Sequence, residues 1–199
     1  MSTGRLEAFS DGVLAIIITV MVLELKPPEG ADFAALHDSA TSLLTYVLSF
    51  VYIGIYWNNH HHLFQICKTV DGTVLWANLH LLFWLSLYPF TTNWMDEEFG
   101  RASVVTYGVN LLLAAIAFTL LQRRMMRMPE SRERMHEVFG SDLKGKASVL
   151  LYVLGIALAF VEPWLGLVPF IAVALIWLVP DPRIERYLQH ERELGRTVD

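Results

Sequence analysis

Hydrophobic residues occupy six long runs along the chain, and short polar segments separate these runs. In order, the runs cover residues 4–25, 39–66, 73–95, 102–121, 148–161 and 164–179. A helix needs about 20 mostly apolar residues to cross a bilayer, which is the length of most of these runs. The last two are shorter, and Glu162 and Pro163 break the apolar stretch between them. The pattern predicts an all-α polytopic membrane protein with six transmembrane helices, a single domain over residues 1–199 and a C-terminal tail at 182–199.

Basic residues gather on one side of this six-span pattern. That side holds 13 of the 15 Lys and Arg residues: Arg5, Lys68, Arg123, Arg124, Arg127, Arg132, Arg134, Lys144, Lys146, Arg183, Arg186, Arg192 and Arg196. The other side holds Lys26 and Arg101. Because an excess of basic residues stays in the cytoplasm, we expect both termini there, in a multi-pass protein of the inner (plasma) membrane. The mixed charges of 128–146 and 183–196 predict surface helices.

Composition excludes several classes of function. Hydrophobic residues make up 54% of the chain and charged residues only 18%, and the net charge of −5 lies in loops and tails. No basic tract with interleaved aromatic residues indicates a nucleic-acid partner. Cys67 is the single cysteine, so an internal disulfide is impossible. No set of nucleophile, base or metal-ligand residues has catalytic spacing, so we expect neither an enzyme nor a cofactor.

Polar residues in three of the predicted spans fall at one depth. Asp11 lies about six residues into the first span, 60–62 lie shortly before the end of the second, and Asn78 and His80 lie six to eight residues into the third. Each position is therefore roughly 10 Å from the cytoplasmic face. A carboxylate at that depth needs hydrogen-bond donors, which histidine, asparagine and Ser10 can supply. The layer is either structural glue between helices or a polar collar that positions the first helix.

The triple histidine His60, His61 and His62 raises the question of a metal site. Consecutive residues of a helix are about 100° apart, so three in a row cannot face one ion. Histidines that share a metal on one helix stand at positions i and i+4. We therefore expect no resident metal, and we expect one or two of the three rings to turn inward.

A stripe of four residues follows the first helix. Ile16, Thr19, Val20 and Leu23 have i, i+3, i+4, i+7 spacing and so share one face. Such a stripe usually packs against a neighbouring helix or lipid, but apolar constrictions also gate pores. The stripe carries no acidic residue, which argues against a filter made of carboxylate rings. Ile17 lies about 100° round the helix, and we expect it to face lipid.

One short segment resembles a known family. Residues 5–11 match the pattern R-x-x-x-F-S-D through Arg5, Phe9, Ser10 and Asp11, and the apolar run 13–19 follows. This segment resembles the bacterial branch of the transmembrane protein 175 family of potassium channels. The similarity covers the whole chain, with six spans, histidines at the end of the second span and a length near 200 residues.

The resemblance implies a homotetramer in which four copies of the first helix line a pore for K⁺ through the bilayer. Channels of this kind lack the usual potassium filter, and this sequence contains no T-V-G-Y-G. The implied constriction is Ile16, Val20 and Leu23, with Val20 where a leucine is common, and Thr19 is the implied layer for cation preference. The implied polar network joins the motif residues to partners among the membrane histidines and Asn78: Arg5, Ser10, Asp11, His60, His61, His62, Asn78 and His80.

The leading hypothesis is therefore a potassium-preferring cation channel, with K⁺ as the permeant ion. The alternative is a proton-coupled transporter that uses Asp11 and the membrane histidines as a relay. A transporter of that kind predicts inverted repeats or broken helices near the midplane, and the sequence indicates neither. A scaffold that conducts nothing is a further possibility, for which the sequence offers no test.

Overall fold

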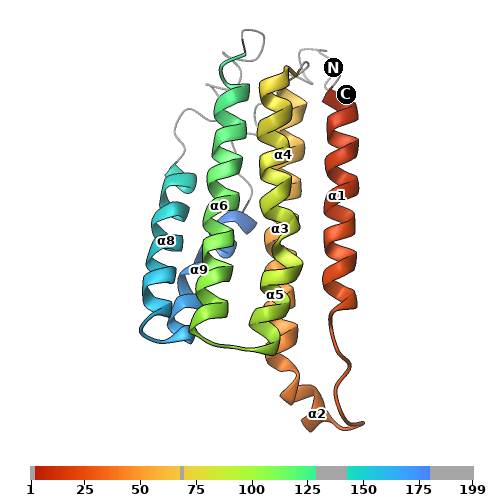
Figure 1. Ribbon diagram of the computed structural model, residues 1–199, viewed down its shortest axis with the longest axis vertical. Helices are drawn as coiled ribbons and strands as arrows, with labels where there is room; N and C mark the ends of the chain where they lie inside the picture. The colour runs from red at the N-terminus through yellow and green to blue at the C-terminus, as the bar shows by residue number, and fades with distance from the viewer. Residues whose placement is uncertain (1–2, 68–69, 129–142, 180–199) are drawn as a thin grey trace.

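A computed structural model describes residues 3–67, 70–128 and 143–179 of the chain, and the regular structure within these ranges is helical throughout. The helices are α1 (Thr3–Leu23), α2 (Phe33–Asp38), α3 (Ala40–Ile66), α4 (Gly72–Ser86), α5 (Tyr88–Glu97), α6 (Arg101–Met125), α8 (Leu143–Ala159) and α9 (Pro163–Leu178). The helices lie along one common axis and alternate in direction along the chain, except that α5 continues in the direction of α4, and the short α2 projects beyond the bundle (Figure 1). Helix α1 lies at one edge against α3, α4 and α5, while α8 and α9 pair at the opposite edge.

The apolar runs of the sequence and the helices coincide closely. The runs 4–25 and 39–66 correspond to α1 and α3 within two residues at every end. Among the described residues, α1, α3 and α6 are long and apolar enough to cross a membrane, and α9 is a shorter apolar helix. The predicted tail at 182–199 and most of the predicted surface helix at 128–146 lie outside the described residues.

The third apolar run is not one continuous helix, contrary to the prediction of unbroken spans. It is divided into α4 and α5 at Leu87, two residues before Pro89. Proline has no N–H to donate and its ring clashes with the carbonyl four residues earlier, so a helix breaks or kinks there. The carbonyl oxygen of Leu87 at the break accepts both the backbone N–H of Thr91 over 3.0 Å and its hydroxyl over 3.1 Å.

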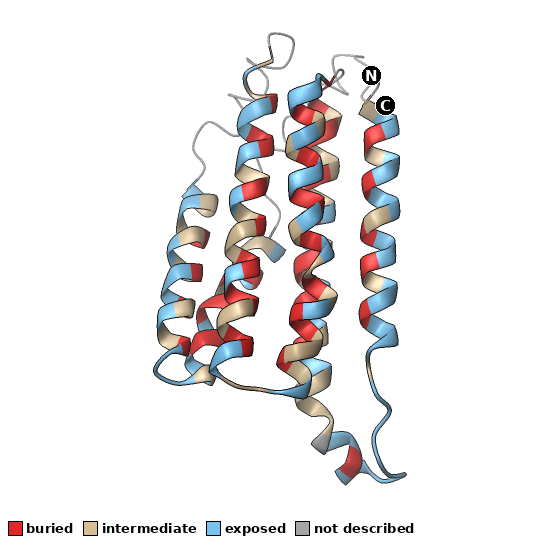
Figure 2. Cartoon of the chain, in the orientation of Figure 1, coloured by how far each residue is buried: buried red, intermediate tan, exposed pale blue. Residues whose placement is uncertain are grey.

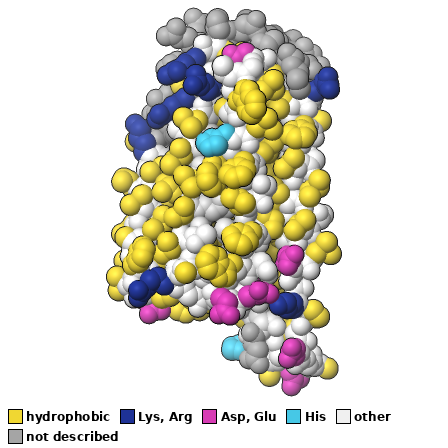
Figure 3. Space-filling view, in the orientation of Figure 1, with side chains coloured by type: hydrophobic (Ala, Val, Ile, Leu, Met, Phe, Trp, Pro, Cys, Tyr) yellow, Lys and Arg dark blue, Asp and Glu magenta, His cyan; other side chains and the backbone are white. Residues whose placement is uncertain are grey.

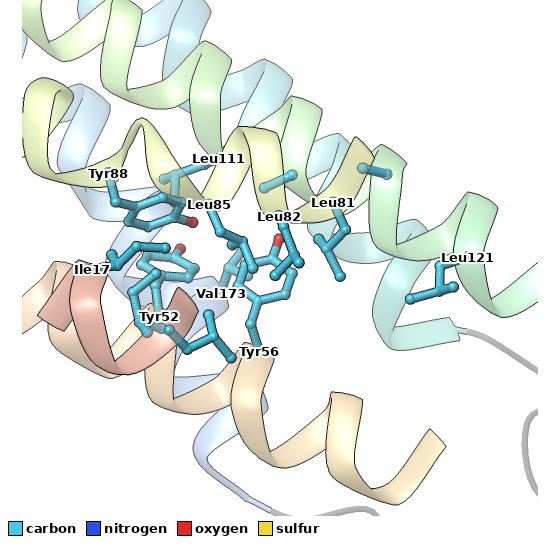
Figure 4. Close-up of a cluster of buried hydrophobic side chains, with 14 of the residues drawn as sticks. Ile17, Tyr52, Tyr56, Leu81, Leu82, Leu85, Tyr88, Leu111, Leu121 and Val173 are labelled. Atoms are coloured by element: carbon cyan, nitrogen blue, oxygen red, sulfur yellow. The ribbon is translucent and has the colours of Figure 1, made fainter. Parts of the chain in front are cut away.

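Large aromatic side chains fill the interior of the bundle (Figure 4). Tyr52, Tyr88, Tyr107 and Phe170 are fully buried, and they come from α3, α5, α6 and α9. The hydroxyl of Tyr52 donates to the carbonyl oxygen of Phe170 over 2.6 Å, which ties α3 to α9. This aromatic core connects α3 and α5, which contact α1, to α6 and α9.

Glycines let the ring of Phe170 fit between two helices. A Cβ atom added at Gly108 on α6 would lie 2.4 Å from Cζ of Phe170, and one added at Gly155 on α8 would lie 2.4 Å from Cε1. Neither distance allows a methyl group. Small residues at helix contacts are typical of membrane bundles, because helices there associate through close packing.

Among the described residues, basic side chains predominate at one end of the bundle and acidic ones at the other, where Figure 3 also shows some Lys or Arg. Arg123 and Arg124 occupy the last turn of α6 at one end. At the other end, the Nζ atom of Lys26 lies 2.8 Å from Oε1 of Glu97, and this carboxylate raises the pKa of Lys26. The middle of the visible face is mostly apolar. This distribution is typical of a protein whose central band contacts lipid.

Candidate pore helix and its polar support

Helix α1 has one face packed into the subunit and one face left open (Figure 2). Its buried residues are spaced three or four apart: Leu6, Ser10, Leu14, Ile17 and Met21. They contact α3, α4 and α5, which positions the helix along its whole length. The opposite face is exposed in the subunit, although it is largely apolar.

The predicted constriction residues lie on the open face. Ile16 is 63% exposed, Val20 37% and Leu23 81%. The neighbouring Ile17 is only 4% exposed, so it packs inside the subunit and does not face lipid as predicted. The prediction for Ile17 was wrong because α1 is rotated about its axis so that Ile17 faces the other helices of the subunit.

Thr19 also lies on the open face, and its hydroxyl has a defined orientation. The Oγ1 atom donates to the carbonyl oxygen of Ile16 over 2.8 Å, within the same helix. Because the hydrogen is engaged with the backbone, the lone pairs of this oxygen remain available to a group outside the helix. The open face therefore carries one oxygen acceptor between apolar side chains.

A buried chain of hydrogen bonds connects three helices behind this face. The Nδ2 atom of Asn78 on α4 donates to Oγ of Ser10 on α1 over 2.9 Å, and Ser10 donates to the carbonyl oxygen of Leu6 over 2.9 Å. The Oδ1 atom of Asn78 lies 2.8 Å from Nε2 of His60 on α3. All three side chains are at most 1% exposed. Asn78 thus uses both ends of its amide to tie α1 to α3.

Hydrogen-bond chemistry assigns the proton on His60. An amide oxygen can only accept, so Nε2 of His60 must carry the hydrogen that Oδ1 of Asn78 receives. The other ring nitrogen, Nδ1, is buried and has no partner among the described residues. The chain ends at the carbonyl of Leu6, which cannot pass a proton onward. This arrangement therefore positions helices and does not form a relay.

Two further side-chain contacts join α1 to α3, and they involve less buried residues than the chain of hydrogen bonds through Asn78. Oδ1 of Asp11 accepts from Nε1 of Trp57 over 3.0 Å, and Oε1 of Glu7 lies 2.7 Å from Nδ1 of His61. The rings of Trp57 and His61 stack with centroids 6.2 Å apart. Gln65 contacts the other nitrogen of His61 over 3.0 Å. Two successive turns of α1 are therefore each joined by a side-chain contact to a turn of α3.

The structure brings together only part of the predicted polar layer. Asp11 is exposed in the subunit, and its donor is Trp57 in place of the predicted histidines, asparagine or Ser10. His80 is also exposed, and it accepts from Trp84 on its own helix over 2.9 Å. His62 contacts Gln65 over 3.4 Å. The expectation that Asp11 is a buried carboxylate is thus corrected.

The two remaining motif residues lie on the open face. Arg5 and Phe9 are both exposed, and they lie near the N-terminal end of α1. They stand four residues apart, and Gly12, Ile16, Thr19 and Leu23 continue the same seam. Alternating spacings of four and three residues are typical of helices that meet copies of themselves around an axis.

Sequence reasoning missed Glu7, Trp57 and Gln65. A signal for the first two was present, because Glu7 and Asp11 are one turn apart on α1, as Trp57 and His61 are on α3. In antiparallel helices the earlier residue of one pair meets the later residue of the other. Within the described residues, no three His, Cys, Asp or Glu side chains are arranged to hold a metal ion.

An all-helical bundle with apolar helices of membrane length defines an integral membrane protein. A family model described as "Endosomal/lysosomal potassium channel TMEM175" matches residues 5–89. A protein named a potassium channel from Chryseobacterium sp. (strain P1-3) is 53% identical over 190 residues, which are 95% of this chain and 99% of that protein. The chain belongs to the TMEM175 family of membrane ion channels, and the family and its relatives are channels, not enzymes.

Two further comparisons concern the fold and a more distant relative. The crystal structure of a lysosomal potassium-selective channel TMEM175 homolog from Chamaesiphon minutus matches with a TM-score of 0.77 and 29% identity, covering 88% of this chain and 96% of that one. The human protein named endosomal/lysosomal proton channel TMEM175 is 27% identical over 98% of this chain but only 42% of its own length.

Proposed function

We propose that this protein is a potassium-preferring cation channel in which four copies of α1 surround a central pore. The observation that carries the proposal is the open face of α1. A helix at the edge of its own subunit, with the opposite face fully used for packing, has a second surface available for copies of itself. The names of the relatives and of the structural match support conduction of K⁺.

The composition of the open face favours a pore over lipid contact. Arg5 and Thr19 lie on the same seam as Ile16, and all three are exposed. A charged side chain against lipid is costly, and helices usually turn such groups toward a bundle interior or water. Around an axis, Arg5 meets water at the pore end, whereas Ile16, Val20 and Leu23 form the narrow apolar layers.

Apolar layers and one hydroxyl layer suggest how cations are sorted. An apolar ring offers permeating water no hydrogen bonds, so it closes or narrows the pore by dewetting. Thr19 contributes one oxygen acceptor per subunit next to Ile16, and its hydrogen is already donated to the backbone. Four such oxygens partly replace the water that K⁺ sheds, and K⁺ sheds its water at lower cost than Na⁺.

Conduction of protons is the second candidate, because the human relative is named a proton channel. The described residues do not favour a relay through Asp11 and the histidines. The partner of Asp11 is the indole of Trp57, which donates only, and the chain from His60 ends on the carbonyl of Leu6. The break at Leu87 carries no ionisable side chain of the kind that a transporter site requires.

The topology belongs to the same proposal. Six spans follow if α4 and α5 cross the membrane together as one broken helix and the shorter α8 and α9 each cross once. Loop charge then places both termini in the cytoplasm and the protein in a bacterial plasma membrane. The homotetramer, the bilayer and permeant K⁺ are the only partners that the proposal requires.

Ion flux into liposomes tests the proposed function. The purified full chain is reconstituted, and tracer uptake is compared for K⁺, Na⁺ and H⁺ under matched gradients. We expect K⁺ uptake to exceed Na⁺ uptake, and both to disappear in protein-free liposomes. Uptake of H⁺ without K⁺ would replace this proposal with the proton channel, and no uptake of any of the three ions would refute conduction.

A further inference from the structure

A cavity lies on the side of the bundle away from α1, between α3, α6, α8 and α9. It is partly open to the surroundings, and the space in it that the centre of a water molecule can reach is about 50 Å³. Its walls are mainly aromatic and aliphatic, and none of its lining residues is charged. None of the contacts described above for α1 uses this space, so it is independent of the proposed pore.

Polar side chains line this cavity among mainly apolar ones. They include the amide of Gln122 and the hydroxyl of Tyr56, and these two residues are 7% and 8% exposed. An amide and a phenol can both donate and accept hydrogen bonds. The cavity therefore offers hydrogen-bonding groups to a ligand that enters it.

One end of the cavity lies near the basic end of the bundle. Gln122 immediately precedes Arg123 and Arg124, and Gly145 lies between Lys144 and Lys146. The Nζ atom of Lys144 lies 5.8 Å from the ring centroid of Trp177, which lines the cavity. The ligand therefore meets positive charge at one end and uncharged walls at the other.

The depth of the cavity fits an elongated molecule. Its lining residues on α6 extend from Ala115 to Gln122, which corresponds to about 10 Å along the helix axis. Phe118, Tyr152 and Trp177 line the apolar part. A ligand that complements the basic end, the polar side chains and the apolar part of the cavity in turn has an anionic group, then ester or amide oxygens, then a hydrocarbon chain.

We infer that the cavity binds an anionic phospholipid from the membrane leaflet at the basic end of the bundle. The phosphate contacts the Lys144 and Arg123 region, a glycerol ester faces Gln122 and Tyr56, and part of one acyl chain enters between Phe118 and Trp177. Basic pockets between transmembrane helices are typical sites for anionic headgroups. The bound lipid bridges four helices, so it stabilises the folded chain by mass action.

The inference is tested by lipid titration of the purified full chain in an uncharged detergent. Dioleoyl phosphatidylglycerol, dioleoyl phosphatidylcholine and glycerol phosphate are compared by native mass spectrometry and by the temperature of unfolding. We expect retained phosphatidylglycerol and a raised unfolding temperature, a smaller effect of phosphatidylcholine, and none of glycerol phosphate. Equal effects of the two lipids would refute the anionic preference, and an equal effect of glycerol phosphate would refute entry of the chain.

Matched variants locate the binding site. Ala115→Phe fills the cavity and should abolish the lipid-dependent shift, whereas Ile116→Phe changes an exposed neighbour and should retain it. Lys144→Gln should weaken phosphatidylglycerol binding about tenfold, and Arg101→Gln at the opposite end should not. Gln122→Leu keeps the shape of the wall and should also weaken binding. If Ile116→Phe or Arg101→Gln reduces binding as much as its counterpart, or Gln122→Leu binds normally, the lipid does not occupy this cavity.

Discussion

Asn78 on α4 donates to the hydroxyl oxygen of Ser10 on α1 over 2.9 Å, and both side chains are fully buried. The same asparagine accepts from His60 on α3. A single amide therefore fixes the position of the proposed pore helix relative to two other helices. The sequence left open whether this polar layer only joins helices or also positions the first helix. Its buried part joins the three helices by hydrogen bonds, and a role in positioning a pore helix stays a prediction.

Asn78→Leu should destabilise the subunit. It leaves the buried Nε2–H group of His60 without an acceptor, which costs about 1–3 kcal/mol. Equilibrium unfolding in mixed micelles measures the change. The matched control is His80→Leu on the same helix, because His80 is exposed and its partner Trp84 belongs to its own helix. Equal losses of stability for the two variants would contradict a special role of Asn78.

Gly108→Ala should also be destabilising, for a different reason. The new methyl group would lie 2.4 Å from the ring of Phe170, and overpacking of this kind costs about 1–3 kcal/mol. Gly54→Ala is the control, because a Cβ there has open space and alanine favours a helix. In the double variant Gly108→Ala with Phe170→Leu, the cost of the alanine should fall. A cost that is unchanged by Phe170→Leu would show that the two residues do not clash.

Stability should depend on pH through the start of α4. The backbone N–H of Val74 and the hydroxyl of Thr73 donate to Asp71 and hold the pKa of this carboxyl below its ordinary value of 3.8. The stabilisation is therefore fully present above the unfolded pKa and is lost as the pH falls through the lower folded pKa.

Asp71→Asn isolates this contribution, because asparagine is also a good helix N-cap but does not titrate. The unfolding temperature of the wild type should decrease more than that of Asp71→Asn between about pH 5 and about pH 3. Parallel curves for the two proteins would show that Asp71 does not contribute to acid sensitivity.

Depth in the bundle was predictable from the sequence, whereas rotation about each helix axis was not. Counting residues from the helix ends placed Asp11, His60 and Asn78 at one level, because every helical residue advances by the same rise. Ser10, which contacts Asn78, is the neighbour of Asp11 in the sequence. Which of three consecutive histidines faces inward depends on the packing of neighbouring helices. The same limit explains the wrong environment predicted for Ile17.

The predicted donors for Asp11 were histidine, asparagine and serine side chains, whereas its donor in the structure is Trp57. The indole N–H of Trp57 serves equally well, and an interfacial tryptophan is common near the end of a span. The break at Leu87 had a clear signal in Pro89, two residues later.

Orientation in the membrane is open to a direct labelling test. Cys67 is only 2% exposed and is therefore a poor reporter. In a Cys67→Ala background, Thr73→Cys lies at the start of α4 and Glu29→Cys lies in the segment between α1 and α2, and both positions are exposed. A membrane-impermeant thiol reagent applied to intact cells should label Glu29→Cys but label Thr73→Cys only after lysis. The reverse pattern would invert the topology.

The central claim is that the open face of α1 lines a pore, and Ile16 and Ile17 form the pair that separates this claim from ordinary helix packing. Ile16 is 63% exposed and Ile17 4% exposed, although they are adjacent in sequence. Ile16→Asn places an amide in each copy of the proposed ring, which admits water and lowers the barrier to ions. Ile17→Asn instead buries an amide inside the subunit, which costs stability.

Single-channel current and reversal potential under opposed K⁺ and Na⁺ gradients, recorded for wild type, Ile16→Asn, Ile17→Asn and Thr19→Ala, test that claim most directly. We expect Ile16→Asn to raise the current and reduce discrimination between K⁺ and Na⁺, and Thr19→Ala to change the reversal potential more than the current. Ile17→Asn should reduce the yield of folded protein without opening a wider path. If Ile16→Asn and Ile17→Asn have indistinguishable effects on both quantities, the open face of α1 does not line the pore.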